Sequence, residues 1–240
     1  MQASPEQQSL VLELQLLDNE IMQANTKLKS LPEVEQLLHI DKRIITATDE
    51  VATVKLEADQ ITLELRRGEV DVETVTDRIK KDEARLASGN ATPKELEQTQ
   101  HEIQTLKKRQ LALEEIELEI MVRSEAVTER SKVLTTDLAS LETLKAEINQ
   151  RLTAATSEIN SLIANKQKAR EAVAVKIEKV LLDLYEKIRT SSGVGAAALV
   201  GNKCNGCNLA INAVEMQRIK TLPLDEVLRC EECRRILVRI

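Results

Sequence analysis

The residues with the clearest chemistry are four cysteines that form two Cys-x-x-Cys pairs. Cys204 and Cys207 make the first pair, and Cys230 and Cys233 the second; the chain has no other cysteine. Four thiolates can close a tetrahedral zinc site, which is structural because no coordination position stays open for a substrate. The segment between the pairs is slightly longer than is common for such sites and leaves room for a helix. The spacing therefore predicts one structural zinc ion.

Disulfides and unligated thiols are the alternatives for these cysteines. The N-terminal residues show neither the basic nor the apolar region of a secretory signal, so paired Cys-x-x-Cys favours a metal over disulfides. No apolar run approaches the roughly 20 residues of a membrane helix. We expect a cytoplasmic protein without membrane association.

The composition indicates which elements carry this site. Among 240 residues there is no Phe, no Trp and one Tyr, and 31% of residues are charged. This profile is typical of long helices and coiled coils and not of a globule with a broad core. The net charge of −6 gives no global attraction to nucleic acid.

Apolar residues at heptad spacing predict the helices. Pro32 predicts a kink or break near residues 29–33, and the composition of residues 87–92 predicts a turn. The expected helices cover about 4–28, 37–86 and 93–189. A hairpin about residue 90 would pair residues whose numbers sum to about 180, setting Arg66 and Arg67 across from residues 114–117, and residues 69–73 across from 107–109.

The predicted fold is mainly α: a long antiparallel coiled-coil helical hairpin, residues 1–190, followed by a small zinc ribbon, residues 191–240. We expect a hinge at 190–195, an edge strand at 196–202 and further short strands at 209–211, 227–229 and 236–240. Asn212, with Glu215 three residues later, predicts the start of a short helix that ends near residue 220. Tyr185 is expected to pack between the hairpin and the ribbon; the alternative is a partner contact.

Basic residues surround the cysteines and have two interpretations. They could bind phosphate groups, or they could offset the negative charge of a zinc–tetrathiolate site and nearby carboxylates. The second is favoured because single-stranded nucleic acid is usually stacked on aromatic side chains, which this chain almost lacks. The candidate partner or nucleic-acid contacts are Lys203, Arg218, Lys220, Arg229, Arg234 and Arg235.

The chain resembles the bacterial C4-type zinc-ribbon family with an N-terminal helical hairpin, particularly its actinobacterial branch. The resemblance rests on residues 192–197, 203–211 and 229–237. Each Cys-x-x-Cys pair with the tight turn that follows it is a zinc knuckle. Knuckles in this family often have Pro after the third cysteine and Gly after the fourth, where this chain has Glu231 and Arg234. The resemblance implies a non-enzymatic protein, either an adaptor for transcription or export components or a nucleic-acid-binding protein.

Two functions therefore remain open from the sequence. The favoured one is an adaptor that binds proteins, and the alternative is RNA or DNA binding through the basic ribbon surface. No nucleophile–base–acid set is evident, so we expect no enzymatic activity. The sequence leaves open whether the chain is a monomer or a homodimer.

Overall fold

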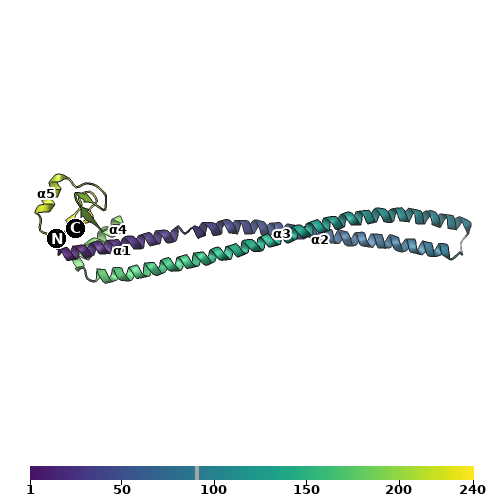
Figure 1. Cartoon of the computed structure of the whole chain (residues 1–240), viewed down its shortest axis with the longest axis horizontal. Helices are drawn as coiled ribbons and strands as arrows, with labels where there is room; N and C mark the ends of the chain where they lie inside the picture. Colours follow the sequence, from purple (N-terminus) through teal and green to yellow (C-terminus); the bar gives the residue numbers. More distant parts are fainter. Residues whose placement is uncertain (90–91) are drawn as a thin grey trace. The chain divides into compact units, whose positions relative to one another are not determined.

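The computed structural model describes residues 1–89 and 92–240. These form two compact units, one of residues 1–34 with 150–240 and one of residues 35–149. None of the helices in the described residues is apolar over a length that could cross a membrane. The elements are α1 (Pro5–Lys29), α2 (Pro32–Ala87), α3 (Pro93–Ala174), α4 (Lys179–Ser192), β1 (Ala196–Val200), β2 (Lys203–Cys204), α5 (Ala213–Thr221), β3 (Leu228–Arg229) and β4 (Ile236–Arg239) (Figure 1). The predicted fold class, a long helical hairpin with a small C-terminal ribbon, is confirmed.

Local capping residues set several helix ends where the sequence predicted them. The Ser4 hydroxyl accepts a hydrogen bond from the Gln7 backbone N–H at 3.2 Å and caps α1. The predicted break is an interruption at residues 30–31, after which Pro32 begins α2. At the start of α3, the Glu95 carboxylate accepts a hydrogen bond from the Thr92 N–H at 2.8 Å. The predicted turn includes residues 90 and 91, which lie outside the described residues.

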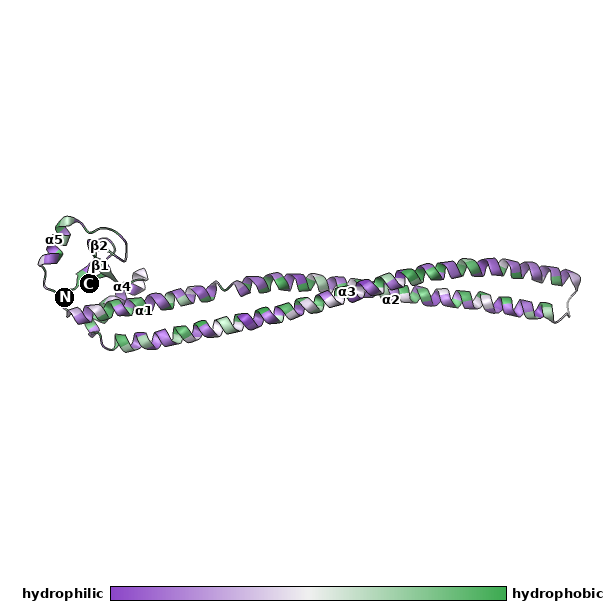
Figure 2. Ribbon diagram, viewed as in Figure 1, coloured by the Kyte–Doolittle hydropathy of each residue, from purple (hydrophilic) through white to green (hydrophobic). Residues whose placement is uncertain are grey.

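The unit of residues 35–149 is held by the predicted apolar seam between α2 and α3. Val54 and Ile61 pack with Val127, and Val75 and Ile79 pack with Ile103. Figure 2 shows hydrophobic residues recurring turn after turn along both helices. The seam is thus built by side chains at heptad spacing, as a coiled coil requires.

The predicted register of this pairing is wrong by several residues. Ion pairs join Lys145 to Asp41 at 2.7 Å and Arg130 to Glu57 at 3.7 Å, so partner numbers sum to 186 or 187. Lys107 lies 2.7 Å from Glu83 and is not paired with the block at residues 69–73. The interlocking of seam side chains fixes the register, and the midpoint of the loop does not predict it.

The long third helix was predicted to continue to about Arg189, but α3 ends at Ala174 and α4 begins at Lys179. The interruption contains neither Gly nor Pro. Its backbone is bonded instead by Gln7, which donates to the Lys176 carbonyl at 2.9 Å and accepts from the Glu178 N–H at 2.8 Å. A contact from α1 therefore replaces helical hydrogen bonds, and no local signal in the sequence could reveal it.

The ribbon contains a four-stranded sheet in the order β2-β1-β4-β3. β1 pairs parallel with β4 and antiparallel with β2, so the prediction of an edge strand at 196–202 is wrong: β1 is central. The predicted strand at 209–211 is reduced to one bridge between Ala210 and Lys203. α5 begins after Asn212, whose side chain accepts from the Glu215 N–H at 2.7 Å as predicted. α1 packs against β1 and β4.

Candidate metal centre and its helical support

The four cysteine sulfur atoms converge on one point of the ribbon. All four lie within 4.8 Å of one another, with Cys204 Sγ 3.8 Å from Cys233 Sγ and Cys207 Sγ 3.9 Å from Cys230 Sγ. A tetrahedron with metal–sulfur bonds of about 2.3 Å has edges of about 3.8 Å, whereas a disulfide would need about 2.05 Å. The donor set and its spacing therefore fit one zinc ion.

Two knuckles with the same backbone geometry present these sulfurs. In the first, the Cys204 N–H donates to the Leu209 carbonyl at 3.1 Å; in the second, the Cys230 N–H donates to the Arg235 carbonyl at 3.0 Å. The residue four positions after each leading cysteine has a positive φ: 61° at Asn208 and 62° at Arg234. The departure from Gly at position 234 therefore leaves the turn intact, at the cost of left-handed backbone in a residue with a side chain.

The protein surroundings alone do not favour four thiolates. Burial raises the pKa of the Cys204 thiol, and it raises the pKa of Cys233 to about 12. The backbone N–H of Leu209 lowers the pKa of Cys207 by hydrogen bonding. Zinc would supply the positive charge that holds all four groups as thiolates, so its binding releases protons and weakens in acid.

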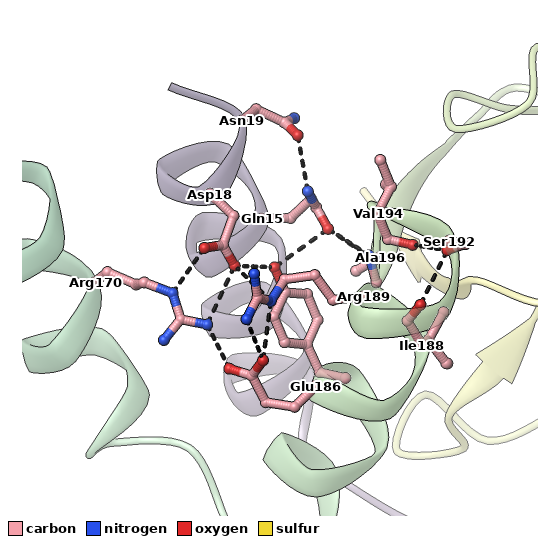
Figure 3. A network of polar contacts seen from close by, with 12 residues as sticks. Gln15, Asp18, Asn19, Arg170, Glu186, Ile188, Arg189, Ser192, Val194 and Ala196 are labelled. Atoms are coloured by element: carbon pink, nitrogen blue, oxygen red, sulfur yellow. Dashed lines mark hydrogen bonds and ion pairs between the residues drawn. The ribbon is translucent and has the colours of Figure 1, made fainter. Parts of the chain in front are cut away.

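A buried glutamine connects α1 to the beginning of the sheet (Figure 3). Gln15 is 3% exposed, and its Oε1 accepts hydrogen bonds from the Gly195 N–H at 2.6 Å and the Ala196 N–H at 3.2 Å. Its Nε2 donates to Asn19 Oδ1 at 2.8 Å. A Cβ at Gly195 would lie 2.6 Å from the Tyr185 ring, so this position needs glycine. The expected hinge is thus held in place at Gly195.

A charged cluster lies beside this glutamine, where α1, α3 and α4 meet (Figure 3). Asp18 accepts a hydrogen bond from Arg170 Nε at 2.7 Å, and Glu186 accepts from Arg189 Nε at 2.9 Å. Arg170 also bonds Glu186, although 16 residues of continuous helix would separate them by about 24 Å. The cluster therefore fixes α4 folded back beside α1 and α3. These carboxylates raise the pKa of Arg170 above its ordinary value.

Tyr185 is fully buried between these elements, as predicted. Its ring belongs to one apolar cluster with Leu14, Leu181 and Ile236, and its hydroxyl donates to Asp18 Oδ2 at 2.6 Å. Sequence analysis missed the polar residues around it. The available signal in the sequence was the heptad spacing of Gln8 and Gln15, two polar residues seven positions apart in the first helix. The structure buries both side chains.

The six candidate basic residues come from β2, α5, β3 and the second knuckle, and several of them are bonded within the ribbon. Arg218 forms two hydrogen bonds with Glu215, at 2.7 and 2.6 Å, which lower the pKa of that carboxyl. Arg235 donates to the Gly206 carbonyl in the first knuckle. These two guanidinium groups are therefore engaged within the ribbon itself.

The other four differ in their surroundings. Arg229 Nε donates to the Arg234 carbonyl at 3.0 Å across the second knuckle. Lys203 on β2, Lys220 on α5 and the side chain of Arg234 are exposed. The structure thus leaves an interrupted basic surface around the cysteines.

Two family models match the chain, one over the helical hairpin and one over the zinc ribbon. Residues 14–193 match the CT398-like coiled coil hairpin domain. The chain belongs to the CT398-like coiled-coil hairpin family. Residues 203–237 match the C4-type zinc ribbon domain, which together with the four converging thiols confirms zinc as the cofactor.

Relatives of this hairpin family agree over the full length. The uncharacterized protein Rv2229c of Mycobacterium tuberculosis is 30% identical over 240 residues, which cover 100% of this chain and 98% of the relative. A solved structure from Mycobacterium smegmatis has 29% identity and a TM-score of 0.83 and covers 100% of both chains. CT398 from Chlamydia trachomatis, at 19% identity, has a TM-score of 0.62 with 98% of both chains covered, and this likeness shows the fold alone. The mycobacterial relatives agree with the expected actinobacterial branch.

Proposed function

We propose that this chain is a non-catalytic adaptor that binds other proteins through its zinc ribbon, while the coiled-coil hairpin offers a second surface. A zinc ion held by four cysteines has no open coordination position. The metal would therefore stabilise the ribbon and would not activate a substrate. The family resemblance suggests components of transcription or export as the class of partner.

The observation that carries this proposal is the engagement of the basic residues. A phosphate-binding surface needs several uncommitted cations, since each contacted phosphate adds to affinity and to its salt dependence. Arg218 is neutralised by Glu215, and Arg235 is bonded to a backbone carbonyl. With no aromatic residue in the ribbon, this arrangement favours a protein over a nucleic acid.

Apolar side chains exposed beside the knuckles supply a surface for such a protein. Leu209 is 51% exposed and Val214 is 83% exposed. Leu209 also lines a small hollow of about 60 Å³ whose walls include Ile211, Ile219 and Glu231. Apolar anchors inside a polar rim are typical of protein interfaces.

The test is a crosslinking pull-down of the full chain from its native cell, with a Leu209→Asp, Val214→Asp variant. We expect the specific partners to be lost, while zinc content stays unchanged because both side chains are exposed. Val175→Asp, Val180→Asp is the matched control. These two residues precede the ribbon in the chain and are 87% and 69% exposed. Equal recovery by all three proteins would contradict the proposed surface.

Nucleic-acid binding is the alternative, supported by the exposed side chains of Lys203, Lys220 and Arg234. It is tested by titrating RNA and DNA across a range of salt concentrations. Contact with several phosphates would give a steep loss of affinity as salt rises. Such a loss, reduced by Lys203→Ala with Lys220→Ala, would favour the alternative over the adaptor.

A further inference from the structure

α2 carries a second apolar stripe that the hairpin does not cover. Its large members, Leu38, Ile45, Leu56, Leu63 and Val70, are 61%, 62%, 65%, 54% and 58% exposed. All lie within the compact unit of residues 35–149 and on one uninterrupted helix. Single exposed apolar residues are ordinary on a protein surface, so their alignment decides whether the set has meaning.

These side chains lie in one line along the helix. At about 100° per residue, the five positions and Ala52 fall within about 40° around the helix axis. The seam that faces α3, through residues such as Ile40 and Val54, is centred about 160° away, on the nearly opposite side of the helix. α2 therefore has two separate apolar faces, and the second extends for about 48 Å from residue 38 to residue 70.

A helix in an isolated two-stranded coil needs only one apolar stripe. Two apolar stripes on nearly opposite sides are typical of a helix that lies between two neighbours. Ile40, Val54 and Ile61 on the first stripe are at most 5% exposed, so α3 occupies that face completely. The second stripe is consistent with a further helix.

We propose that the second stripe of α2 binds the same stripe of a second copy of this chain, antiparallel, about a two-fold axis near residue 54. The successive steps along the stripe are seven, seven, four, seven and seven residues, which read the same in both directions. The axis would set Leu38 opposite Val70 of the second copy, Ile45 opposite Leu63, and Ala52 opposite Leu56. Such self-complementarity is what a two-fold contact requires, because each pair occurs twice.

The charges at one edge of the stripe also fit this arrangement. Asp41 and Arg66 lie on the same edge, and the axis brings each beside the other in the second copy. Asp41 already lies 2.7 Å from Lys145 in its own chain but keeps an exposed carboxylate, with 45% of its side chain accessible. At the opposite edge, Lys42 would lie near Arg67 of the second copy, which is an unfavourable contact.

The size of the contact indicates a weak, reversible dimer. A strip about 48 Å long and about one helix diameter wide covers roughly 500–600 Å² per copy. This is below the roughly 800 Å² per partner of a standard interface. Because the axis also repeats the unfavourable contact between Lys42 and Arg67, we expect dissociation in the micromolar range. The dimer is independent of the proposed adaptor function and uses a different surface.

Sedimentation velocity of the zinc-loaded full chain tests the proposal over a wide range of concentration. The wild type should pass reversibly from monomer to dimer. Leu56→Lys with Leu63→Lys should weaken association at least about tenfold. Leu111→Lys with Leu118→Lys on α3 is the matched control, since these residues are 66% and 61% exposed and lie outside the stripe; it should dimerise like the wild type. Circular dichroism checks that helicity is retained in both variants.

A gain in affinity provides a test that unfolding cannot imitate. Lys42→Glu replaces the repulsion by Arg67 of the second copy with an attraction and should tighten the dimer several-fold at low salt. Arg66→Asp should weaken it. A wild type that stays monomeric at every concentration, or a dimer that the α2 substitutions leave unchanged, would overturn the proposal.

Discussion

The two faces of the ribbon sheet contain similar small aliphatic residues but are stabilised in different ways. On one face, Ala196, Ile236 and Val238 pack against the helices around Tyr185. On the other, Ala197 and Leu237 pack against α5 and the cysteines. Side chains alternate along a strand, so neighbouring residues of β1 and β4 belong to different cores. One core has long helices as its partner, and the other depends on a metal.

This contrast shows how a chain with no Phe and no Trp holds a small sheet. Small domains without a sufficient apolar core usually need a metal or disulfides. Here zinc supports only one face of the sheet, because the other face packs against α1 and α4. The ribbon is therefore partly a module of its own and partly an extension of the helical core.

Removal of zinc should have the largest effect. Cys204→Ser, or a strong chelator, removes metal binding worth about 10–16 kcal/mol in small zinc modules. We expect the zinc-side face, with α5 and both knuckles, to lose protection in hydrogen exchange. Protection should persist in α1, α4 and the parts of β1 and β4 that face them. If α1 and α4 lost protection as well, the two faces would form a single cooperative unit.

Tyr185→Ala should have the next largest effect and should act on the opposite face. It removes the largest fully buried side chain and leaves a cavity next to Leu14 and Leu181. Truncation of a buried aromatic residue to Ala costs about 3–5 kcal/mol. Urea unfolding should show this loss, while a colorimetric zinc assay should still find one zinc per chain. Zinc loss in folded Tyr185→Ala protein would show that the metal centre depends on the helical face.

Gln15→Leu probes the connection between the helices and the sheet without making a large cavity. It removes the acceptor of the Gly195 and Ala196 N–H groups, both on buried residues. A buried donor left without an acceptor costs about 1–3 kcal/mol, so we expect a loss of about 3 kcal/mol in urea unfolding. Leu12→Ala, a partly buried neighbour on α1, is the control. An equal loss in both variants would assign the effect to packing and not to the hydrogen bonds.

The sequence predicted the elements whose signals are local. The capping residues Ser4, Thr92 and Asn212 begin helices, the heptad residues form the seam, and four cysteines at metal spacing converge. Each of these depends on a few residues within one segment. The metal centre was therefore predictable even though the sheet order around it was not.

The predictions that were wrong concern features that depend on residues far apart in the sequence. The end of α3 at Ala174 depends on Gln7, which is 169 positions from Lys176 in the chain. The central position of β1 depends on parallel pairing with β4, and the coiled-coil register depends on how two helices interlock. The charged cluster around Asp18 needs three helices to meet. Periodicity within one segment contains none of this information.

Arg234→Gly should slightly raise the stability of the zinc-side face, whereas the substitutions above lower stability. Arg234 has a φ of 62°, which costs a residue with a side chain about 1–2 kcal/mol and glycine very little. We expect a gain of about 1 kcal/mol at most, since glycine also increases the entropy of the unfolded chain. Chelator competition should show slower zinc release, because the gain lies in the second knuckle. Arg229→Gly, outside the left-handed position, should give no such gain.

Tyr185→Phe keeps the ring on the helical face and removes the hydrogen bonds of the hydroxyl to Asp18 at 2.6 Å and to Gln15 at 3.2 Å, for a loss of about 1–2 kcal/mol near neutral pH. Burial, and then the bond to Asp18, raise the pKa of the hydroxyl above its ordinary value. The folded state thus keeps the phenol protonated, while the unfolded chain ionises it near pH 10. The contribution is present in full below about pH 10 and is lost as pH rises further.

The stability of the wild type should therefore fall more steeply than that of Tyr185→Phe above about pH 10, and the difference between them should narrow. Urea unfolding across this range measures both slopes. Because Tyr185 is the only tyrosine and the chain has no tryptophan, phenolate absorbance reports this one group directly. It should rise only as the protein unfolds. Ionisation near pH 10 in the folded protein would mean that water reaches the hydroxyl, and the helical face would then lack the dry core on which its independence from zinc depends.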